Sequence, residues 1–209
     1  MDVTGAPEGF RHVAAYLDQV AQTQLVGLVL ERIDESFWFQ PTTPRWNRPF
    51  SVRMSNLGAL GWVSDTRGYR YQPDHPDTRL PWPSIPVELL RIWHDLTSLP
   101  DPPDACLVNL YRGNARMGLH QDKDELDLTL PVLSVSLGDE AVFRIGGLKR
   151  SDPTSSLRLC SGDLCLLGGK ARLAYHGIDR ILPGSSDLVP GGGRLNLTLR
   201  CARVTTGRR

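Results

Sequence analysis

The chain has 209 residues, of which 40% are hydrophobic and 22% are charged, a composition typical of a globular protein that can bury a core. Its formal net charge of +1 excludes a bulk excess of basic residues, so nucleic acid would have to bind through a local patch. The sequence shows neither a secretory signal nor an apolar run of the roughly 20 residues that span a bilayer. We therefore expect a monomeric cytoplasmic protein that does not bind membranes.

Two helices are predicted in the first hundred residues. Residues 22–33, QTQLVGLVLERI, carry apolar side chains at nearly helical spacing. Residues 84–96, SIPVELLRIWHDL, do the same, with Ser84 as a candidate cap and Pro86 in the first turn. Residues 40–83 lie between the two helices and are rich in proline, glycine, arginine and aromatic residues, which predicts loops and short strands with exposed rings.

Residues 40–55, QPTTPRWNRPFSVRMS, form a basic and aromatic segment within this region. It interleaves three arginines with two aromatic residues, namely Arg45, Trp46, Arg48, Phe50 and Arg53. Such a mixture can grip the backbone of a nucleic-acid single strand. A hydrophobic hairpin lid, whose arginines extend their charged ends into water, is an equal alternative.

Short strands dominate the second half of the chain. They are rich in β-forming residues, are separated by Gly, Asp or Ser, and comprise ACLVNLYR (105–112), LPVLSVSLG (130–138), AVFRIGG (141–147), SLRLC (156–160), DLCLLGG (163–169), RLAYHGI (172–178) and RLNLTLRCARV (194–204). This density of strands predicts a β-sandwich or a jelly roll. We expect a mainly β protein in which residues 1–100 supply helices and a loop-rich lobe, and residues 101–209 the core of one integrated domain.

The four cysteines, Cys106, Cys160, Cys165 and Cys201, form no C-x-x-C pair. Their spacing therefore indicates neither a zinc ribbon nor a thioredoxin-like redox motif. Cysteines flanked by apolar residues, in a chain without a secretion signal, are typical of reduced core residues. We expect all four thiols to be reduced and buried.

Two of the five histidines lie in the predicted β half, His120 in GLHQDKD and His176 in LAYHGID. Residues i and i+2 of an extended segment point to the same side, so His120 and Asp122 can face one ion. Two imidazoles and one carboxylate leave positions open on octahedral Fe(II), which can then bind oxygen and a co-substrate. A surface His-x-Asp beside an unrelated core histidine is the alternative, because this pair alone is a weak motif.

The last predicted strand contains RLNLTLR, which alternates strictly between leucines and polar residues. Its polar face carries Arg194, Asn196, Thr198 and Arg200. Such alternation most often marks a half-buried strand whose polar face is solvated. Arginine, however, suits bidentate pairing with carboxylates, and a dicarboxylate co-substrate needs cationic anchors close to the metal. The strand therefore strengthens the case for a metal site at the His-x-Asp pair.

Several segments resemble one family, the bacterial AlkB proteins, across roughly residues 50–203. The resemblance rests on DACLVNLYRGNARMGLHQDKDE, PVLSVSLGDEAVFRIGGLKRSDP, GDLCLLGGKARLAYHGI and RLNLTLR, which follow one another in the family's order. MSNLGALGWVSDTRGYRYQP resembles the family's substrate-recognition lobe, whereas residues 1–40 match only weakly and residues 40–55 depart from the pattern. The resemblance implies a double-stranded β-helix, or jelly-roll, core with flanking helices and an N-terminal nucleotide-recognition lobe or lid.

The resemblance also implies the residues that bind metal and co-substrate. The iron ligands would be His120, Asp122 and His176. Arg194 would pair with the distal carboxylate of 2-oxoglutarate, and Arg200 and Asn196 would contact the end nearer the metal. Asn109, Tyr111 and Thr198 would complete this pocket.

A second set of residues would contact the substrate. Trp62 would stack on a flipped base opposite His120, and Tyr69, Arg70 and Tyr71 would hold the nucleotide phosphates. Asp124 would contact the exocyclic amine of the base, and Arg150 would line the pocket of the damaged base.

Each of these substrate assignments has a simpler structural alternative. Trp62 is equally a core tryptophan, and the two tyrosines equally one face of a strand. Asp124, Glu125 and Asp127 would ordinarily be solvated acids, and Arg150 an ordinary turn residue.

AlkB proteins are Fe(II)- and 2-oxoglutarate-dependent dioxygenases that repair alkylated DNA. The resemblance thus implies oxidative dealkylation of bases such as 1-methyladenine and 3-methylcytosine, with release of formaldehyde, succinate and carbon dioxide. The substrate would be DNA that is single-stranded or presents a flipped base, or RNA. The alternatives are the same chemistry on RNA, protein or a small molecule, and a non-catalytic β-sandwich that binds nucleic acid.

Overall fold

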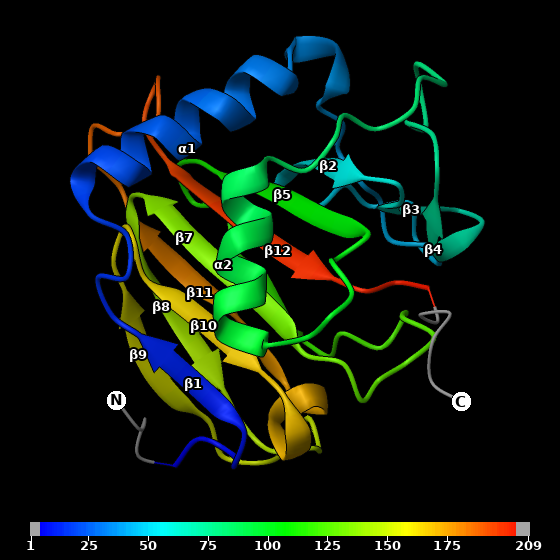
Figure 1. Ribbon diagram of the computed structural model, residues 1–209. Coiled ribbons are helices and arrows are strands. Elements are labelled where there is room, and N and C mark those ends of the chain that lie inside the picture. The colour runs from blue at the N-terminus through cyan, green and yellow to red at the C-terminus, as the bar shows by residue number, and fades with distance from the viewer. Residues whose placement is uncertain (1–4, 204–209) are drawn as a thin grey trace.

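Two antiparallel sheets face each other in the computed structural model, which describes residues 5–203 (Figure 1). The large sheet has the strand order β1 (Phe10–Val13), β10 (Leu164–Leu167), β7 (Val132–Gly138), β12 (Arg194–Arg200), β5 (Ala105–Tyr111) and β2 (Arg53–Gly58). The small sheet has the order β6 (Met117–His120), β11 (His176–Leu182), β8 (Glu140–Ile145) and β9 (Ser155–Leu159). This arrangement confirms the predicted jelly-roll core.

A separate hairpin of β3 (Gly61–Asp65) and β4 (Gly68–Gln72) lies at one end of the large sheet (Figure 1). The first hundred residues thus supply this hairpin, but also β1 and β2 of the large sheet. Because β2 pairs with β5 along six residues, the N-terminal part and the β core share one continuous sheet.

Both α-helices cover the outer face of the large sheet, α1 (Gln19–Arg32) along one end and α2 (Val87–Thr97) across the middle (Figure 1). Short 3-10 helices occur at Glu35–Phe37 and Gly169–Leu173. In residues 5–203 no helix is long and apolar enough to cross a membrane.

The ends of the two helices differ from the prediction. Helix α1 begins earlier, at Gln19, because the Asp18 carboxylate accepts the amide N–H of Ala21 as an N-cap. Ser84 does not cap α2, which begins after Pro86 without a side-chain cap. The residue before a proline disfavours the α conformation, so the helix cannot begin at Ile85.

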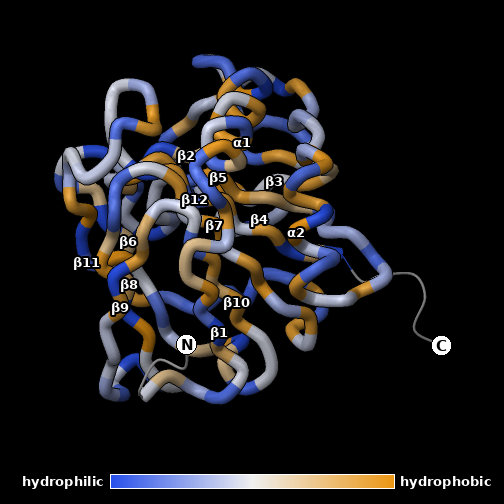
Figure 2. The backbone as a smooth tube through the Cα atoms, turned by 60° about the vertical axis from the view of Figure 1, so that its left-hand side comes forward, coloured by the Kyte–Doolittle hydropathy of each residue, from blue (hydrophilic) through white to orange (hydrophobic). Residues whose placement is uncertain are grey.

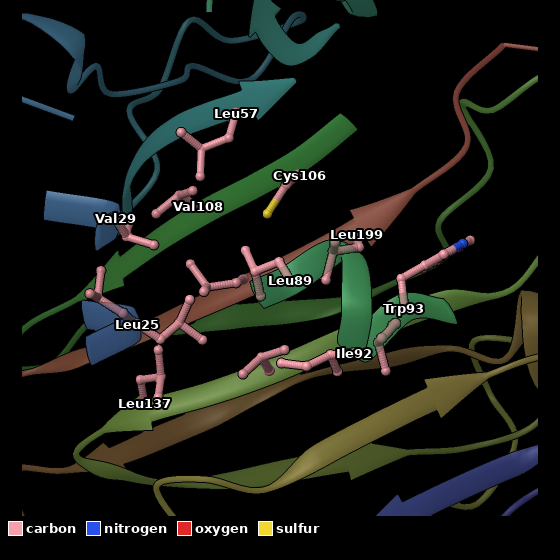
Figure 3. Packing of buried hydrophobic residues seen from close by; sticks show 14 of the residues in the cluster. Leu25, Val29, Leu57, Leu89, Ile92, Trp93, Cys106, Val108, Leu137 and Leu199 are labelled. Atoms are coloured by element: carbon pink, nitrogen blue, oxygen red, sulfur yellow. The ribbon is translucent and has the colours of Figure 1, made fainter. Parts of the chain in front are cut away.

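One hydrophobic cluster lies between the helices and the large sheet. Leu89 and Trp93 of α2 are buried against Leu199 of β12, and Leu25 of α1 lies near Leu137 of β7 (Figure 3). The central strands of the large sheet carry correspondingly hydrophobic colour (Figure 2). A second cluster lies between the two sheets and includes Leu107, Val132, Phe143, Ile145 and Ile178.

Strand β12 contributes to both sides of the large sheet. Its leucines, Leu195, Leu197 and Leu199, belong to the cluster beneath the helices. Because side chains alternate along a strand, the four polar residues point into the space between the sheets. All seven residues of β12 are buried, so its polar face is an interior surface and not a solvated one.

Several other details were not predicted from the sequence. Strands β1 and β6 were missed, and residues 172–175, predicted as strand, lie instead in a 3-10 helix and the turn that leads to β11. The prediction that all cysteines are buried is wrong for Cys160, which is exposed, whereas the other three are buried, and all four are free. Cys160 ends up in water because it follows β9, at the edge of the small sheet.

The packing of α2 yields a first prediction. Leu89→Ala should lower the free energy of unfolding by about 2–5 kcal/mol, because Leu89 is completely buried and its truncation leaves a cavity. Val87→Ala in the same helix removes a side chain that is 51% exposed and should change stability by less than about 0.5 kcal/mol. Denaturant unfolding of both variants measures the difference, and equal losses would contradict this packing.

Candidate active site

A cluster of two histidines and one aspartate lies at the end of the small sheet. Strands β6 and β11 pair so that His120 and His176 are direct partners, and their ring centroids lie 4.6 Å apart. Asp122 follows two residues after β6 ends, with its carboxylate oxygens 3.7 Å from His120 Nε2 and 3.6 Å from His176 Nε2. One potential ligand atom from each residue lies within 4.8 Å of the other two.

The backbone fixes which nitrogen each imidazole presents to this cluster. His120 Nδ1 donates to the carbonyl oxygen of Gly118, and His176 Nδ1 donates to that of Ala174, both at 2.9 Å. A proton on Nδ1 leaves the Nε2 lone pair free, and backbone carbonyls commonly orient metal-binding histidines in this way. Both Nε2 atoms therefore face Asp122 as ready ligands.

Electrostatics favour an ionised Asp122 and a neutral His176, which are the forms that bind a metal. Burial opposes ionisation of Asp122, but the charges of Arg200 and the two histidines outweigh it and hold the pKa of the carboxyl below its usual range. Burial, reinforced by His120, lowers the pKa of His176 to about 4. Asp122 Oδ2 is buried and has no hydrogen-bond partner among residues 5–203. An orphaned carboxylate oxygen beside two free imidazole nitrogens fits a divalent cation.

The cluster borders a cavity of about 340 Å³ between the two sheets. Apolar side chains such as Leu107, Val132 and Phe143 line its interior, and polar groups gather near the cluster and along β12. A mostly apolar cavity with a few convergent polar groups is the usual form of a small-molecule site.

Arg194 places a cation in this cavity. Its side chain is almost fully buried, Nη2 donates to Ser136 Oγ at 2.9 Å, and the guanidinium lies 5.4 Å from the centre of the Tyr111 ring. Nε and Nη1 have no hydrogen-bond partner within the described part of the chain. Burial lowers the pKa of Arg194, and Tyr111 acts against this. A buried guanidinium with free donors fits a carboxylate ligand, which would satisfy them.

Amide and hydroxyl groups surround the same space. Asn196 Nδ2 donates to Ser134 Oγ and to the carbonyl oxygen of Val135, while Asn196 Oδ1 accepts the Thr198 hydroxyl at 3.2 Å. Asn109 is the direct partner of Asn196 across β5 and β12 and also lines the cavity. These hydrogen bonds hold the Asn196 amide in one orientation, so that it presents a fixed polar surface to a ligand.

A buried network of charged side chains holds Asp122 of the His–Asp–His cluster in place. Arg200 bridges Asp122 Oδ1 at 3.0 Å and Glu125 Oε1 at 2.8 Å. Arg172 donates to Glu125 Oε2 at 3.0 Å and to the backbone oxygen of Asp122 at 2.5 Å. The Tyr71 hydroxyl donates to Glu125 Oε1 at 2.6 Å. The network joins β4 and β12 to the loop that carries Asp122.

The interpretation of Glu125 as a solvated acid is therefore wrong. Only 5% of the residue is exposed, and burial opposes its ionisation, but Arg200 foremost, with Tyr71 and Arg172, lowers its pKa. Arg172 was missed by the sequence analysis, because nothing in GGKARL marks it as a partner of an acid 47 residues away. Only the tertiary contact reveals the pair.

Aromatic side chains gather around the cavity on the β3–β4 side. Trp62 stacks on Tyr69 with centroids 5.6 Å apart and an interplanar angle of 17°, and Phe50 lies 6.3 Å from Trp62. Trp62 Nε1 donates to Asp124 Oδ2 at 2.8 Å. All four side chains line the cavity, and Trp62 is half-buried, as expected for a ring that a ligand can reach.

Of the remaining predicted substrate residues, one lines the cavity and two do not. Arg150 lines the cavity and donates to the backbone oxygen of Leu119. Arg70 and Tyr71 do not line it, since Arg70 forms two hydrogen bonds with Asp65 and Tyr71 points to Glu125. The aromatic residue Phe50 was not predicted as part of the site, although the basic and aromatic character of residues 40–55 was its signal.

Comparison with known proteins agrees with this geometry. Residues 9–200 match the family model of the 2OG-Fe(II) oxygenase superfamily. The chain is 60% identical over 196 residues to the alpha-ketoglutarate-dependent dioxygenase AlkB homolog of Caulobacter vibrioides, covering 94% of this chain and 89% of the relative. It is 43% identical over 186 residues to the alpha-ketoglutarate-dependent dioxygenase AlkB of Escherichia coli, covering 87% and 85%.

A solved structure is similar as well. The structure of OsALKBH1 superposes with a TM-score of 0.79 at 32% sequence identity, covering 93% of this chain and 98% of the other. This similarity extends over the whole jelly roll and supports the same family assignment as the sequence relatives.

The charge network around Glu125 yields a second prediction. Glu125→Gln should lower the free energy of unfolding by roughly 3–5 kcal/mol, because the neutral amide leaves Arg172 and Arg200 without their buried counter-charge. Asp187→Asn neutralises an exposed carboxylate and should change stability by less than about 0.5 kcal/mol. Denaturant unfolding compares the two variants. Equal stability of Glu125→Gln and the unmodified protein would show that the network is not a stabilising one.

Proposed function

This chain belongs to the 2OG-Fe(II) oxygenase superfamily and is an AlkB-type, Fe(II)- and 2-oxoglutarate-dependent dioxygenase, and from that premise we propose that it removes alkyl groups oxidatively from N-alkylated bases of DNA. The products would be formaldehyde, succinate, carbon dioxide and the unmodified base. Bases such as 1-methyladenine and 3-methylcytosine are the proposed substrates, because their methyl groups can be presented to a metal only from an extruded base.

One observation carries the proposal. The cluster of His120, Asp122 and His176 and an aromatic platform of Trp62 and Tyr69 border the same cavity. Every base has a π-face, so a pair of stacked rings suits a nucleobase. A base held on this platform would present its edge toward the cluster.

Iron bound at the cluster supplies the activation of oxygen, together with 2-oxoglutarate as the source of two electrons. The three side chains would hold the metal, with Asp122 fixed by Arg200. Arg194 would bind the distal carboxylate of 2-oxoglutarate through its unpaired donors, and Arg200 and Asn196 would contact the end nearer the metal. Asn109, Tyr111 and Thr198 would order that pocket.

The protein groups near the platform would select the substrate. Trp62 would stack on the base. Asp124, oriented by the hydrogen bond that Trp62 donates to it, would accept a hydrogen bond from the exocyclic amine of the base. Arg150 would line the pocket of the damaged base. The position of the platform inside the cavity lining favours a single strand or a flipped base, because a base stacked inside a duplex cannot reach it.

Removal of a metal ligand tests the proposed centre. Asp122→Ala should lower formaldehyde release from a methylated single-stranded oligonucleotide by more than about 100-fold, since loss of even an outer partner of a metal ligand costs 10–100-fold. Circular dichroism checks that the variant remains folded, and Asp187→Asn serves as the control for an exposed carboxylate. Activity within a factor of two of the unmodified enzyme would remove Asp122 from the centre.

Arg194 tests the co-substrate pocket. Arg194→Ala should raise the KM for 2-oxoglutarate by roughly 10- to 100-fold, because a carboxylate then loses a charge-assisted partner in a buried site. Arg91→Ala, on the exposed side of α2, is the matched control. An unchanged KM would assign the distal carboxylate to another residue.

The proposed substrate is tested by formaldehyde release from methylated single-stranded DNA, duplex DNA, RNA and peptide under the same conditions. Release from either form of DNA above that from RNA and peptide supports the proposal. Release from RNA or peptide alone would keep the oxygenase chemistry and replace the substrate.

A further inference from the structure

A short hairpin beside the cavity is not used by the chemistry described above. This tip hairpin comprises residues 42–49 and is closed by a β-bridge between Thr42 and Pro49. Thr43 N donates to the Arg48 oxygen at 2.8 Å, Asn47 N donates to the Thr43 oxygen at 2.8 Å, and Asn47 has a φ of 47°. The Thr43 hydroxyl accepts Arg48 N at 3.1 Å. The turn is therefore locally ordered by its own hydrogen bonds.

The tip hairpin is attached to the strand that carries the aromatic platform. Thr42 N donates to the Ser64 oxygen at 3.1 Å, and the Ser64 hydroxyl donates to the Thr42 oxygen at 2.6 Å. Immediately after the hairpin, Phe50 packs on Trp62 and lines the cavity. The tip is thus held at a fixed place next to residues that line the cavity.

The side chains at the end of the tip hairpin are exposed. Trp46 is 65% exposed, and the Arg45 guanidinium lies 4.8 Å from the centre of its ring. Arg45, Asn47 and Arg48 are also exposed, and the hairpin contains no acidic residue. The Trp46 indole is therefore accessible to a ligand from solvent.

We propose that the tip hairpin binds the nucleic-acid strand next to the extruded base. Trp46 stacks on a neighbouring base, and Arg45 and Arg48 pair with the phosphates on either side of it. This inference rests on the proposed function, because a base in the cavity brings its neighbours to the tip. An exposed ring combined with cations and no acid matches the chemistry of single strands, in which bases stack and phosphates repel acids.

A second copy of this chain is a poorer partner for the same surface. A stable protein interface buries about 800 Å² on each side, much more than one indole ring offers. Two copies of the hairpin would also bring arginines together, and like charges repel.

Binding of a methylated single strand of about 12 nucleotides tests the contact. Fluorescence anisotropy with anaerobic enzyme, Fe(II) and 2-oxoglutarate should show roughly ten-fold weaker binding for Trp46→Ala, and near-normal binding for Trp46→Phe. Val20→Ala, which truncates an exposed side chain on α1, is the control. A methylated mononucleotide has no neighbouring base. With this substrate, Trp46→Ala should therefore lower kcat/KM by less than about two-fold.

Salt dependence tests the two arginines. Each of Arg45→Ala and Arg48→Ala should reduce the slope of log affinity against log salt by about 0.7, the value for one phosphate contact on a single strand. Arg91→Ala should leave the slope unchanged, because this residue lies on α2, which covers the outer face of the large sheet and is not part of the tip hairpin.

The outcomes separate this inference from the proposed function. Unchanged strand affinity in Trp46→Ala, with formaldehyde release intact, overturns the hairpin contact alone. Equal losses for strand and mononucleotide also overturn it, because the hairpin then only supports the cavity. Self-association that depends on Trp46 overturns it in favour of a second copy. Strand binding that depends on Trp46 without any formaldehyde release supports the contact and overturns the proposed dealkylation.

Discussion

The position of Arg200 between Asp122 and Glu125 is the interaction on which the rest of the site depends. Two carboxylates that ionise inside a protein need counter-charges, because an unpaired buried charge costs several kcal/mol. Arg200 supplies one and Arg172 the other, and neither acid is left without a cation. The Asp122 carboxylate, one of the three candidate metal ligands, is thus held ionised and in place by protein contacts alone.

This network also links parts of the chain that are far apart in the sequence. Tyr71 reaches it from the β3–β4 hairpin, Glu125 from the loop after β6, and Arg200 from the last strand. The hairpin that carries Trp62 is therefore tied to the same charges that orient Asp122. One hydrogen bond, from Tyr71 to Glu125, and two ion pairs, Glu125–Arg200 and Arg200–Asp122, connect the hairpin to the candidate triad.

Strand β12 explains how a small jelly roll holds a polar pocket without losing its core. Its leucines complete the packing beneath α1 and α2, and the opposite face carries Arg194 and Asn196 into the space between the sheets. The alternation of leucines and polar residues in this strand correctly predicted that it has one apolar face and one polar face. It could not show that a second sheet covers the polar face, because alternation is the same whether that face meets water or a cavity.

The sequence by itself determined most of the strands and, through the resemblance to AlkB proteins, the jelly-roll class and the candidate triad of His120, Asp122 and His176. The strands follow from local periodicity, and the triad follows from short motifs around residues 120 and 176 that occur in the family's order. Only the tertiary structure decided that Glu125 is buried and paired with Arg172, and that Trp46 stands exposed beside the cavity. Burial and pairing depend on which segments fold against one another, and a charged or aromatic residue looks the same in the sequence whether its neighbour is water or a partner from a distant strand.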